Sequence, residues 1–153
     1  MSERPASAFQ HAPDPDNPGW TLWGGHDTGL FSSHFDPIRV RADGEGKARV
    51  RCIPGDGLKN YSGNVHGGAM AGFVDIALFA GMWACGVADE AGATTVDLSI
   101  QYQSVALVGE PLDVEVEIMR ETGRMLFMRG LVTQQAGVTA SFLATIRKRT
   151  RKN

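Results

Sequence analysis

The chain has 153 residues, of which 42% are hydrophobic and 21% are charged, and its net charge is −2. A chain of this length and composition is expected to form one domain around one hydrophobic core. Lysines and arginines are spread along it until the last residues, so it lacks the basic face that nucleic-acid-binding proteins use. The basic residues 148–153 are expected to form a solvated tail, or alternatively to attract an anionic ligand or surface.

The N-terminal residues 1–19 carry four prolines among aspartates and asparagines. This composition favours a flexible arm over a helix or a central strand. No apolar stretch typical of a signal peptide follows Met1. Cys52 and Cys85 lack CxxC spacing and are expected to be ordinary reduced thiols. These features favour a cytoplasmic protein whose folded domain spans residues 20–147.

Alternating apolar and polar residues predict two strands in the first half of the domain, over residues 38–41 and 48–53. The turn residues 43–46 between them indicate a hairpin. Between residues 20 and 33, aromatic residues alternate with glycines; this segment could anchor on the core, and no element is assigned to it. A loop rich in Asn, Ser and Gly follows the hairpin and ends in His66–Gly67–Gly68.

An apolar run with a single charge, Asp75, extends over residues 69–88. That length could span a bilayer, but three glycines interrupt the run and no basic residue flanks it closely. Apolar side chains recur all round a helix drawn over residues 68–85, and such a helix is expected to be buried on all faces. We therefore predict a core helix and no membrane association.

Four further strands are predicted from period-two alternation, over residues 95–102, 112–118, 125–134 and 138–146. In the first of them, Leu98 is expected on the face opposite to Thr95. The order of elements, with short turns in the second half, predicts an α+β domain whose antiparallel sheet packs on one long central helix. Six strands leave two sheet edges, which invite pairing with a second copy.

Asp75 is the candidate catalytic residue, because it is the only charge in a helix predicted to be buried. Burying an unpaired carboxylate costs on the order of several kcal/mol. A structural explanation is that Asp75 caps a loop or meets an arginine such as Arg124. The functional explanation is that it serves as a base or a nucleophile. The turn before the helix favours the second, since Gly67–Gly68 lets a ligand approach unpaired N–H groups that could hold an oxyanion.

The segment Asn60–Gly68, followed by Asp75 in the spacing HGG–x6–D, resembles the active-site segment of hotdog-fold thioesterases, and is closest to their PaaI-like branch. Thr94–Tyr102 is similar to the next strand of that family. The resemblance extends over residues 38–146. It implies the hotdog fold, in which an antiparallel sheet wraps around one long central helix.

The resemblance also implies a role for each site residue. Asp75 would be the general base or nucleophile, Gly67 N–H and Asn60 would polarise the thioester carbonyl, and Thr95 would orient the water. His66 and Gly68 would border the substrate, with His66 mainly shaping the loop. Two subunits of a homodimer or homotetramer would share each site.

The implied reaction is hydrolysis of an acyl-CoA to a carboxylic acid and free CoA, with no cofactor and no metal, since the four histidines show no ligand spacing. Relatives often carry an Arg-Pro pair after the strand that ends at Tyr102, and this chain does not. CoA phosphates would then need other contacts, for which the candidates are Arg124, Arg129 and the basic tail. The alternatives are a hotdog-fold enoyl-CoA hydratase or dehydratase, and a non-catalytic acyl-thioester-binding module.

Overall fold

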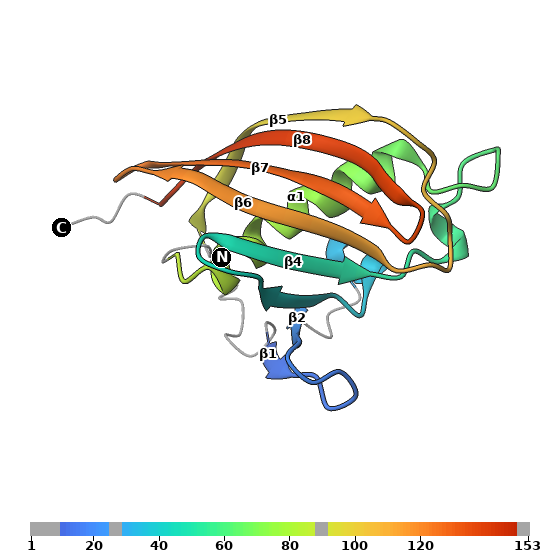
Figure 1. The fold of residues 1–153 in the computed structure, drawn as a ribbon, viewed down its shortest axis with the longest axis horizontal. Coiled ribbons are helices and arrows are strands. Elements are labelled where there is room, and N and C mark those ends of the chain that lie inside the picture. Colours follow the sequence, from blue (N-terminus) through green and yellow to red (C-terminus); the bar gives the residue numbers. More distant parts are fainter. Residues whose placement is uncertain (1–9, 25–28, 88–91, 150–153) are drawn as a thin grey trace.

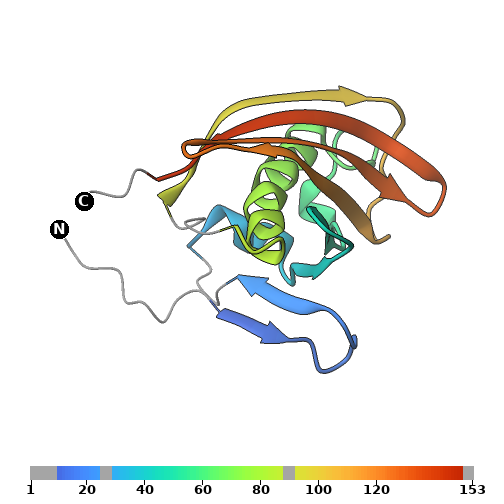
Figure 2. The ribbon, with the colours of Figure 1, turned by 60° about the vertical axis from the view of Figure 1, so that its left-hand side comes forward.

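A computed structural model describes residues 10–24, 29–87 and 92–149. One long helix, α1 (Gly67–Ala84), lies across the concave face of a single curved sheet (Figure 1). Turned by 60°, the molecule shows the sheet bending around this helix (Figure 2). The predicted α+β architecture, an antiparallel sheet wrapped around one central helix, is confirmed.

The described sheet has eight strands, in the order β1-β2-β3-β4-β6-β7-β8-β5, and all neighbours are antiparallel. The strands are β1 (Gln10–Pro13), β2 (Thr21–Gly24), β3 (Arg39–Ala42), β4 (Lys47–Cys52), β5 (Thr94–Tyr102), β6 (Leu112–Glu121), β7 (Met125–Gln134) and β8 (Gly137–Arg147). Two short 3-10 helices, η1 (Phe31–Phe35) and η2 (Asp56–Leu58), lie in the connections.

The sheet begins earlier in the chain than the sequence pattern indicated. Residues 10–13 form the edge strand β1, which pairs only with β2 in the described sheet. An edge strand tolerates Pro13, because its missing N–H faces away from the ladder. Four-residue strands in a Pro- and Gly-rich segment carry too little alternation to be recognised. The rest of the predicted arm, residues 1–9, and residues 150–153 of the predicted tail lie outside the described residues.

The N-terminal segment is fastened to the outer face of β3 and β4 by charged groups. The buried carboxylate of Asp14 accepts a hydrogen bond from Arg39 Nε. The guanidinium groups of Arg41 and Arg51 lie over the ring of Trp20, 4.6 and 4.8 Å from its centre. These contacts hold Asp14 and Trp20 of this Pro-rich segment against β3 and β4.

An arginine–carboxylate cluster ties β4 to β6 on the same outer face. Asp113 is only 6% exposed and accepts hydrogen bonds from Arg51 at 2.6 and 2.8 Å and from Arg49 at 3.0 Å. Burial by itself would raise the pKa of Asp113, but the hydrogen bonds from Arg51 and Arg49 outweigh it and hold the pKa below its ordinary value. The ionised carboxylate is therefore part of what holds these strands together.

Helix α1 is fully buried on one side only, and its other side is partly covered by Phe31 of η1, which lies against Gly72, and by His11 of β1, whose ring stacks on Trp83 at 4.4 Å. Its sheet-facing side packs closely, since a methyl group placed on Gly81 would lie 3.0 Å from Val116. The opposite stripe is exposed at Gly68 and only partly buried at Ala71, Gly72, Asp75, Ile76, Phe79 and Trp83. The prediction of burial on all faces is thus wrong for a single chain. By length and composition α1 could cross a membrane, yet it lies against the sheet as a core helix does.

Strand β5 lies at the sheet edge, where β8 is its only strand neighbour in the described sheet. The pairing shifts at Val96, because Thr95 lies opposite Ile146 while Asp97 lies opposite Thr145. This bulge puts Thr95 on the same, helix-facing side as Leu98. The predicted strict alternation, with Thr95 and Leu98 on opposite faces, is therefore wrong, and the irregularity directs Thr95 toward α1.

Candidate active site

Asp75 lies on the open stripe of α1, about two turns into the helix. Its Oδ1 accepts a hydrogen bond of 2.6 Å from Thr95 Oγ1 on β5, and both residues are partly buried. Asp75 is thus less buried than the apolar run predicted. Among the described residues its partner is Thr95 and not Arg124, which lies in the turn before β7 and donates its backbone N–H to Thr122.

The helix start holds a second group of polar atoms. His66 is the N-cap of α1, and its Nδ1 accepts a 2.9 Å hydrogen bond from Gly68 N–H. The His66 carbonyl accepts from Met70 N–H at 3.0 Å. Within the described part of the chain, this leaves Gly67 N–H without an acceptor, whereas Gly68 N–H is already used. Gly67 N–H is therefore one donor available to a ligand at this turn, and among the described residues Ala69 N–H likewise has no acceptor.

Asn60 closes the loop that leads to this turn. Its Oδ1 accepts from Ser62 N–H at 2.9 Å and from Asn64 N–H at 3.1 Å, and its own N–H donates to the Asn64 carbonyl at 2.8 Å. The amide oxygen is thus committed to the loop. Only the Nδ2 hydrogens could polarise a substrate carbonyl, as the role predicted for Asn60 requires.

Tyr102, the last residue of β5, reaches the same turn and was not singled out from the sequence. Its hydroxyl donates a 2.6 Å hydrogen bond to the Gly67 carbonyl. A methyl group placed on Gly67 would lie 3.4 Å from Tyr102 Cζ, so the ring also covers this glycine. The period-two pattern from Leu98 through Ile100 to Tyr102 already placed this ring on the helix-facing side.

One chain holds these groups as two separate halves. Gly67 and Asp75 are eight residues apart on α1, which corresponds to about 12 Å along the helix axis. A thioester carbonyl and the water attacking it span only about 3 Å. A single substrate therefore cannot contact Gly67 N–H and the Asp75 carboxylate of the same chain during the reaction.

Neither cysteine suits a nucleophilic role. Cys52 is fully buried in β4, and this burial raises the pKa of its thiol. Burial also raises the pKa of the Cys85 thiol at the end of α1. Both thiols are free and remain protonated at neutral pH. In the described part of the chain, no three His, Cys, Asp or Glu side chains gather as metal ligands would.

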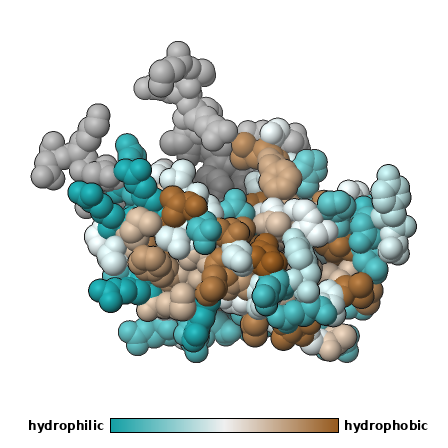
Figure 3. Space-filling view, turned by 90° about the horizontal axis from the view of Figure 1, so that it is seen from above, coloured by the Kyte–Doolittle hydropathy of each residue, from teal (hydrophilic) through white to brown (hydrophobic). Residues whose placement is uncertain are grey.

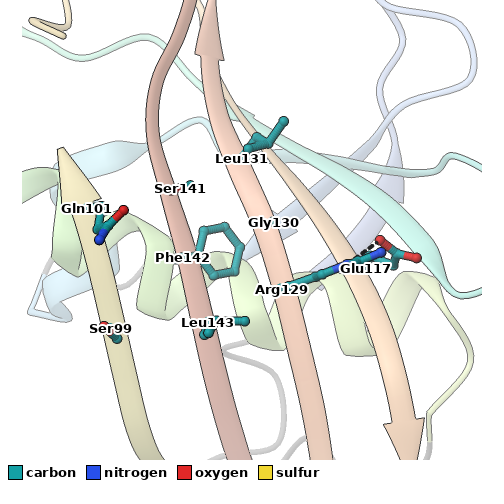
Figure 4. A pocket seen from close by; sticks show the side chains of 9 residues that line it. All are labelled: Ser99, Gln101, Glu117, Arg129, Gly130, Leu131, Ser141, Phe142 and Leu143. Carbon is teal, nitrogen blue, oxygen red and sulfur yellow. Dashed lines mark hydrogen bonds and ion pairs between the residues drawn. The ribbon is translucent and has the colours of Figure 1, made fainter. Parts of the chain in front are cut away.

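A hollow of about 580 Å³ lies over β5, β8, β7 and β6, and Figure 4 shows it in front of the sheet with α1 behind. Its lining includes Ser99, Ser141 and Leu143, which alternate with helix-facing residues and so point away from Asp75. Arg129, predicted as one candidate for CoA phosphates, donates here to Glu117 at 2.9 Å. This hydrogen bond lowers the pKa of Glu117 and raises that of Arg129, so the cation already has a partner.

Known structures share this fold. The thioesterase superfamily member 2 of zebrafish superposes with a TM-score of 0.70 at 20% identity, covering 80% of this chain and 89% of that one. A hypothetical thioesterase of Streptococcus pneumoniae, solved with coenzyme A, gives 0.67 at 20% identity over 79% and 92%. The E. coli PaaI protein, from the phenylacetic acid degradation operon, gives 0.62 at 18% identity over 74% and 80%.

No protein of curated function matches the chain by sequence. The sequence profile of the thioesterase superfamily matches residues 62–141. That span is more than half of the chain and contains Gly67, Asp75, Thr95 and Tyr102. Together with the sheet wrapped around α1, this match places the chain in the thioesterase superfamily, with the hotdog fold of its PaaI-like members.

Proposed function

We propose that the protein hydrolyses acyl-CoA thioesters to a carboxylic acid and free CoA. The observation that carries this proposal is the 2.6 Å bond between Thr95 Oγ1 and the Asp75 carboxylate on the open side of α1. The free N–H of Gly67 at the start of the same helix supplies the second requirement, a donor for an oxyanion. CoA in the pneumococcal relative supports the choice of carrier.

Two copies of the chain would complete each site through the free edge of β5. Asp75 is bonded to Thr95 near the start of β5, and Gly67 is bonded to Tyr102 at its end. If two β5 strands pair antiparallel about an axis near Leu98–Ser99, the start of one lies beside the end of the other. The Asp75 half-site of one copy then meets the Gly67 half-site of the second.

The surface on the β5 side suits such a contact. Seen from this side, apolar surface runs through the middle of the face (Figure 3). On β5 itself, Val96 and Tyr102 are each 52% exposed in the single chain. Burying such side chains together with the open stripe of α1 would stabilise a dimer. Light scattering that finds a stable, active monomer would rule out the shared site.

The proposed chemistry uses only groups of the chain and one water. Asp75 takes a proton from the water while the water oxygen attacks the carbonyl carbon of the thioester, and Thr95 holds the Asp75 carboxylate in place. The carbonyl oxygen gains the negative charge and is held by Gly67 N–H, with Asn60 Nδ2 as a second donor. When the intermediate collapses, the C–S bond breaks and the thiolate recovers the proton from Asp75. Direct attack by Asp75, through a mixed anhydride, uses the same groups.

The phosphates of CoA would be held outside this centre. Because Arg129 is paired with Glu117, the better candidates are Arg124 and the basic tail. Within the described part of the chain, no carboxylate is paired with Arg124 or with Arg149. Comparison of acyl-CoA with the acyl-pantetheine substrate tests whether phosphates contribute to KM.

The decisive experiment is Asp75→Asn in a thiol-release assay across short, medium, long and aromatic acyl-CoAs. Asparagine keeps an oxygen that accepts from Thr95, so the fold is preserved while the base is lost. We expect a loss of at least about 100-fold in kcat. The matched control is Asp16→Asn, an exposed carboxylate between β1 and β2 at the opposite edge of the sheet, which should leave kcat unchanged. A near-wild-type rate for Asp75→Asn would show that Asp75 is not the base.

The same panel separates the alternatives. The imidazole of His66 is engaged as the cap of α1, so it is poorly placed for the acid–base work of a hydratase. If the wild-type protein hydrates crotonyl-CoA, the hydratase function is favoured over hydrolysis. A non-catalytic binding module would instead be indicated if acyl-CoA raises the melting temperature and no thiol is released from any substrate.

A further inference from the structure

We infer that Tyr102 is a positioning residue for the oxyanion donor, acting through the peptide unit that joins Gly67 to Gly68. This inference rests on the proposed function, in which Gly67 N–H holds the developing negative charge. Tyr102 itself need not touch the substrate's reacting atoms. Its hydroxyl donates to the Gly67 carbonyl at 2.6 Å, and its ring lies against the same glycine.

The peptide unit between the two glycines is held at both ends. Its oxygen, on Gly67, accepts from the Tyr102 hydroxyl, and its N–H, on Gly68, donates to His66 Nδ1 at 2.9 Å. Two consecutive glycines have the widest backbone freedom of any dipeptide. Side chains that hold both ends of their shared peptide plane therefore limit how Gly67 can rotate, and with it the direction of the Gly67 N–H.

The preceding peptide unit is held as well. Its carbonyl, on His66, accepts the Met70 N–H at 3.0 Å, and its N–H is the free donor on Gly67. That donor is thus aligned by the helix on one side and by the Tyr102–His66 pair on the other. An oxyanion donor stabilises the transition state only if its direction is set before the charge develops.

The Tyr102 hydroxyl is not needed to satisfy the Gly67 carbonyl. In an α-helix that oxygen already accepts from the N–H four residues later. Tyr102 is also 52% exposed in the single chain, so its hydroxyl could bond to water instead, and the net gain in stability from the bond is small. The bond instead fixes the orientation of the peptide unit between Gly67 and Gly68, which points to a role in positioning.

The location of Tyr102 on β5 fits the same role. This strand contacts both halves of the machinery, with Thr95 bonded to Asp75 near its start and Tyr102 bonded to Gly67 at its end. A strand that pairs with β8 along eight residues is a rigid base for both contacts. The carboxylate and the donor are therefore held against one rigid element.

The test is Tyr102→Phe, with Ser104→Ala as the matched control. Phenylalanine keeps the ring over Gly67 and removes only the hydroxyl. Ser104, just after the end of β5, also donates its hydroxyl to a backbone carbonyl, that of Val138 on β8 at 3.0 Å. We expect kcat to fall about 10- to 100-fold in Tyr102→Phe with KM within threefold, because a misdirected donor weakens mainly the transition state. Ser104→Ala should stay within twofold of wild type in both.

A pair of uncleavable ligands provides a readout that a purely structural role would not move. A trifluoromethyl ketone carried on the sulfur of CoA, CoA–S–CH2–CO–CF3, hydrates in water, and its tetrahedral carbon offers Gly67 N–H an oxygen like that of the developing oxyanion. The S-alkyl-CoA thioether offers no carbonyl. Tyr102→Phe should weaken the trifluoromethyl ketone at least fivefold more than the thioether, whereas general loosening of the fold would weaken both equally.

These outcomes separate the two proposals. A wild-type protein that releases no thiol overturns the proposed function, and the ratio of the two dissociation constants still reports on the Gly67 donor. A wild-type protein that is active, with Tyr102→Phe unchanged in kcat and in that ratio, overturns the role of Tyr102 alone. Poor folding of Tyr102→Phe, seen as a much lower Tm than that of Ser104→Ala, would show that the hydroxyl is structural and would likewise overturn it.

Discussion

Thr95→Val isolates the hydroxyl that contacts the candidate base. Valine has nearly the shape of threonine and a high preference for strands, so β5 and its bulge should be preserved. The change removes the 2.6 Å hydrogen bond from Thr95 Oγ1 to Asp75 Oδ1. Asp75 then loses the group that fixes its rotamer on the open side of α1.

The size of the effect follows from the exposure of the pair. A hydrogen bond to a charged acceptor contributes about 1.5–3 kcal/mol. Since Thr95 and Asp75 are both only partly buried, water can replace part of the bond, and the lower end of this range applies. About 1.4 kcal/mol corresponds to a factor of ten in rate. We therefore expect kcat to fall about tenfold, with a loss in unfolding free energy of about 1.5 kcal/mol.

The assay is steady-state thiol release with the best acyl-CoA from the panel, accompanied by urea unfolding. Thr139→Val is the control, because Thr139 Oγ1 donates to the Val132 carbonyl at 3.1 Å in a buried part of the sheet. This variant should lose about 1 kcal/mol of stability with no change in kcat. If Thr95→Val retains kcat within threefold, or if Thr139→Val shares the loss, the contact with Asp75 has no special part in catalysis.

Three further predictions concern the surroundings of the site. Asn60→Asp keeps the oxygen that accepts from Ser62 and Asn64 and removes the Nδ2 donor, so kcat should fall while the Tm stays close to wild type. Asn60→Ala should lower both kcat and Tm. If Asn60→Asp has the kcat of wild type, Asn60 does not belong to the oxyanion site. His66→Ala should lower the free energy of unfolding by about 1 kcal/mol because the helix cap is lost, and His66→Asn, which can cap the helix, should restore most of it. If His66→Asn restores stability but not kcat, His66 has a chemical role. Asp113→Asn should destabilise by about 2–3 kcal/mol at pH 7, because it removes the buried negative charge that pairs with Arg49 and Arg51 and one of its two accepting oxygens. Since the folded state lowers the pKa of Asp113, the difference from wild type should be full above the ordinary carboxyl pKa of about 4 and should shrink as the pH falls from there through the lower pKa of the folded state. Urea midpoints between pH 2 and 7 check this, and a difference independent of pH would contradict it.

Much of the fold could be predicted because its strands and helix obey simple periods. The alternation in residues 112–118 and 138–146 marks strands with one buried face, and the apolar run around Asp75 marks the helix. β1 and β2 could not be recognised in this way. They are short, they carry Pro13 and Gly24, and they are held by Asp14 and Trp20 through contacts with arginines on β3 and β4. Such contacts join residues far apart in the chain and leave no local pattern.

The same contrast applies to the candidate site. The spacing from His66 to Asp75 is readable in the sequence, because the residues belong to one helix and its cap. The bond between Thr95 and Asp75 depends on a bulge at Val96, which reverses the side that strict alternation assigns to Thr95. The hydrogen bond from Tyr102 to the Gly67 carbonyl depends on the end of β5 lying beside the start of α1. Neither follows from residue spacing.

By itself the sequence determined the central helix, six of the eight described strands, their antiparallel connection and the candidate groups for the chemistry, because hydrophobic periods and glycine turns act over a few residues. Only the tertiary structure decided which of those groups meet. It showed that one side of α1 stays open, so that Asp75 lies at a surface and not in a closed core. The apolar pattern of a helix indicates that its surface is to be buried, but it does not indicate whether the same chain or a second molecule buries it.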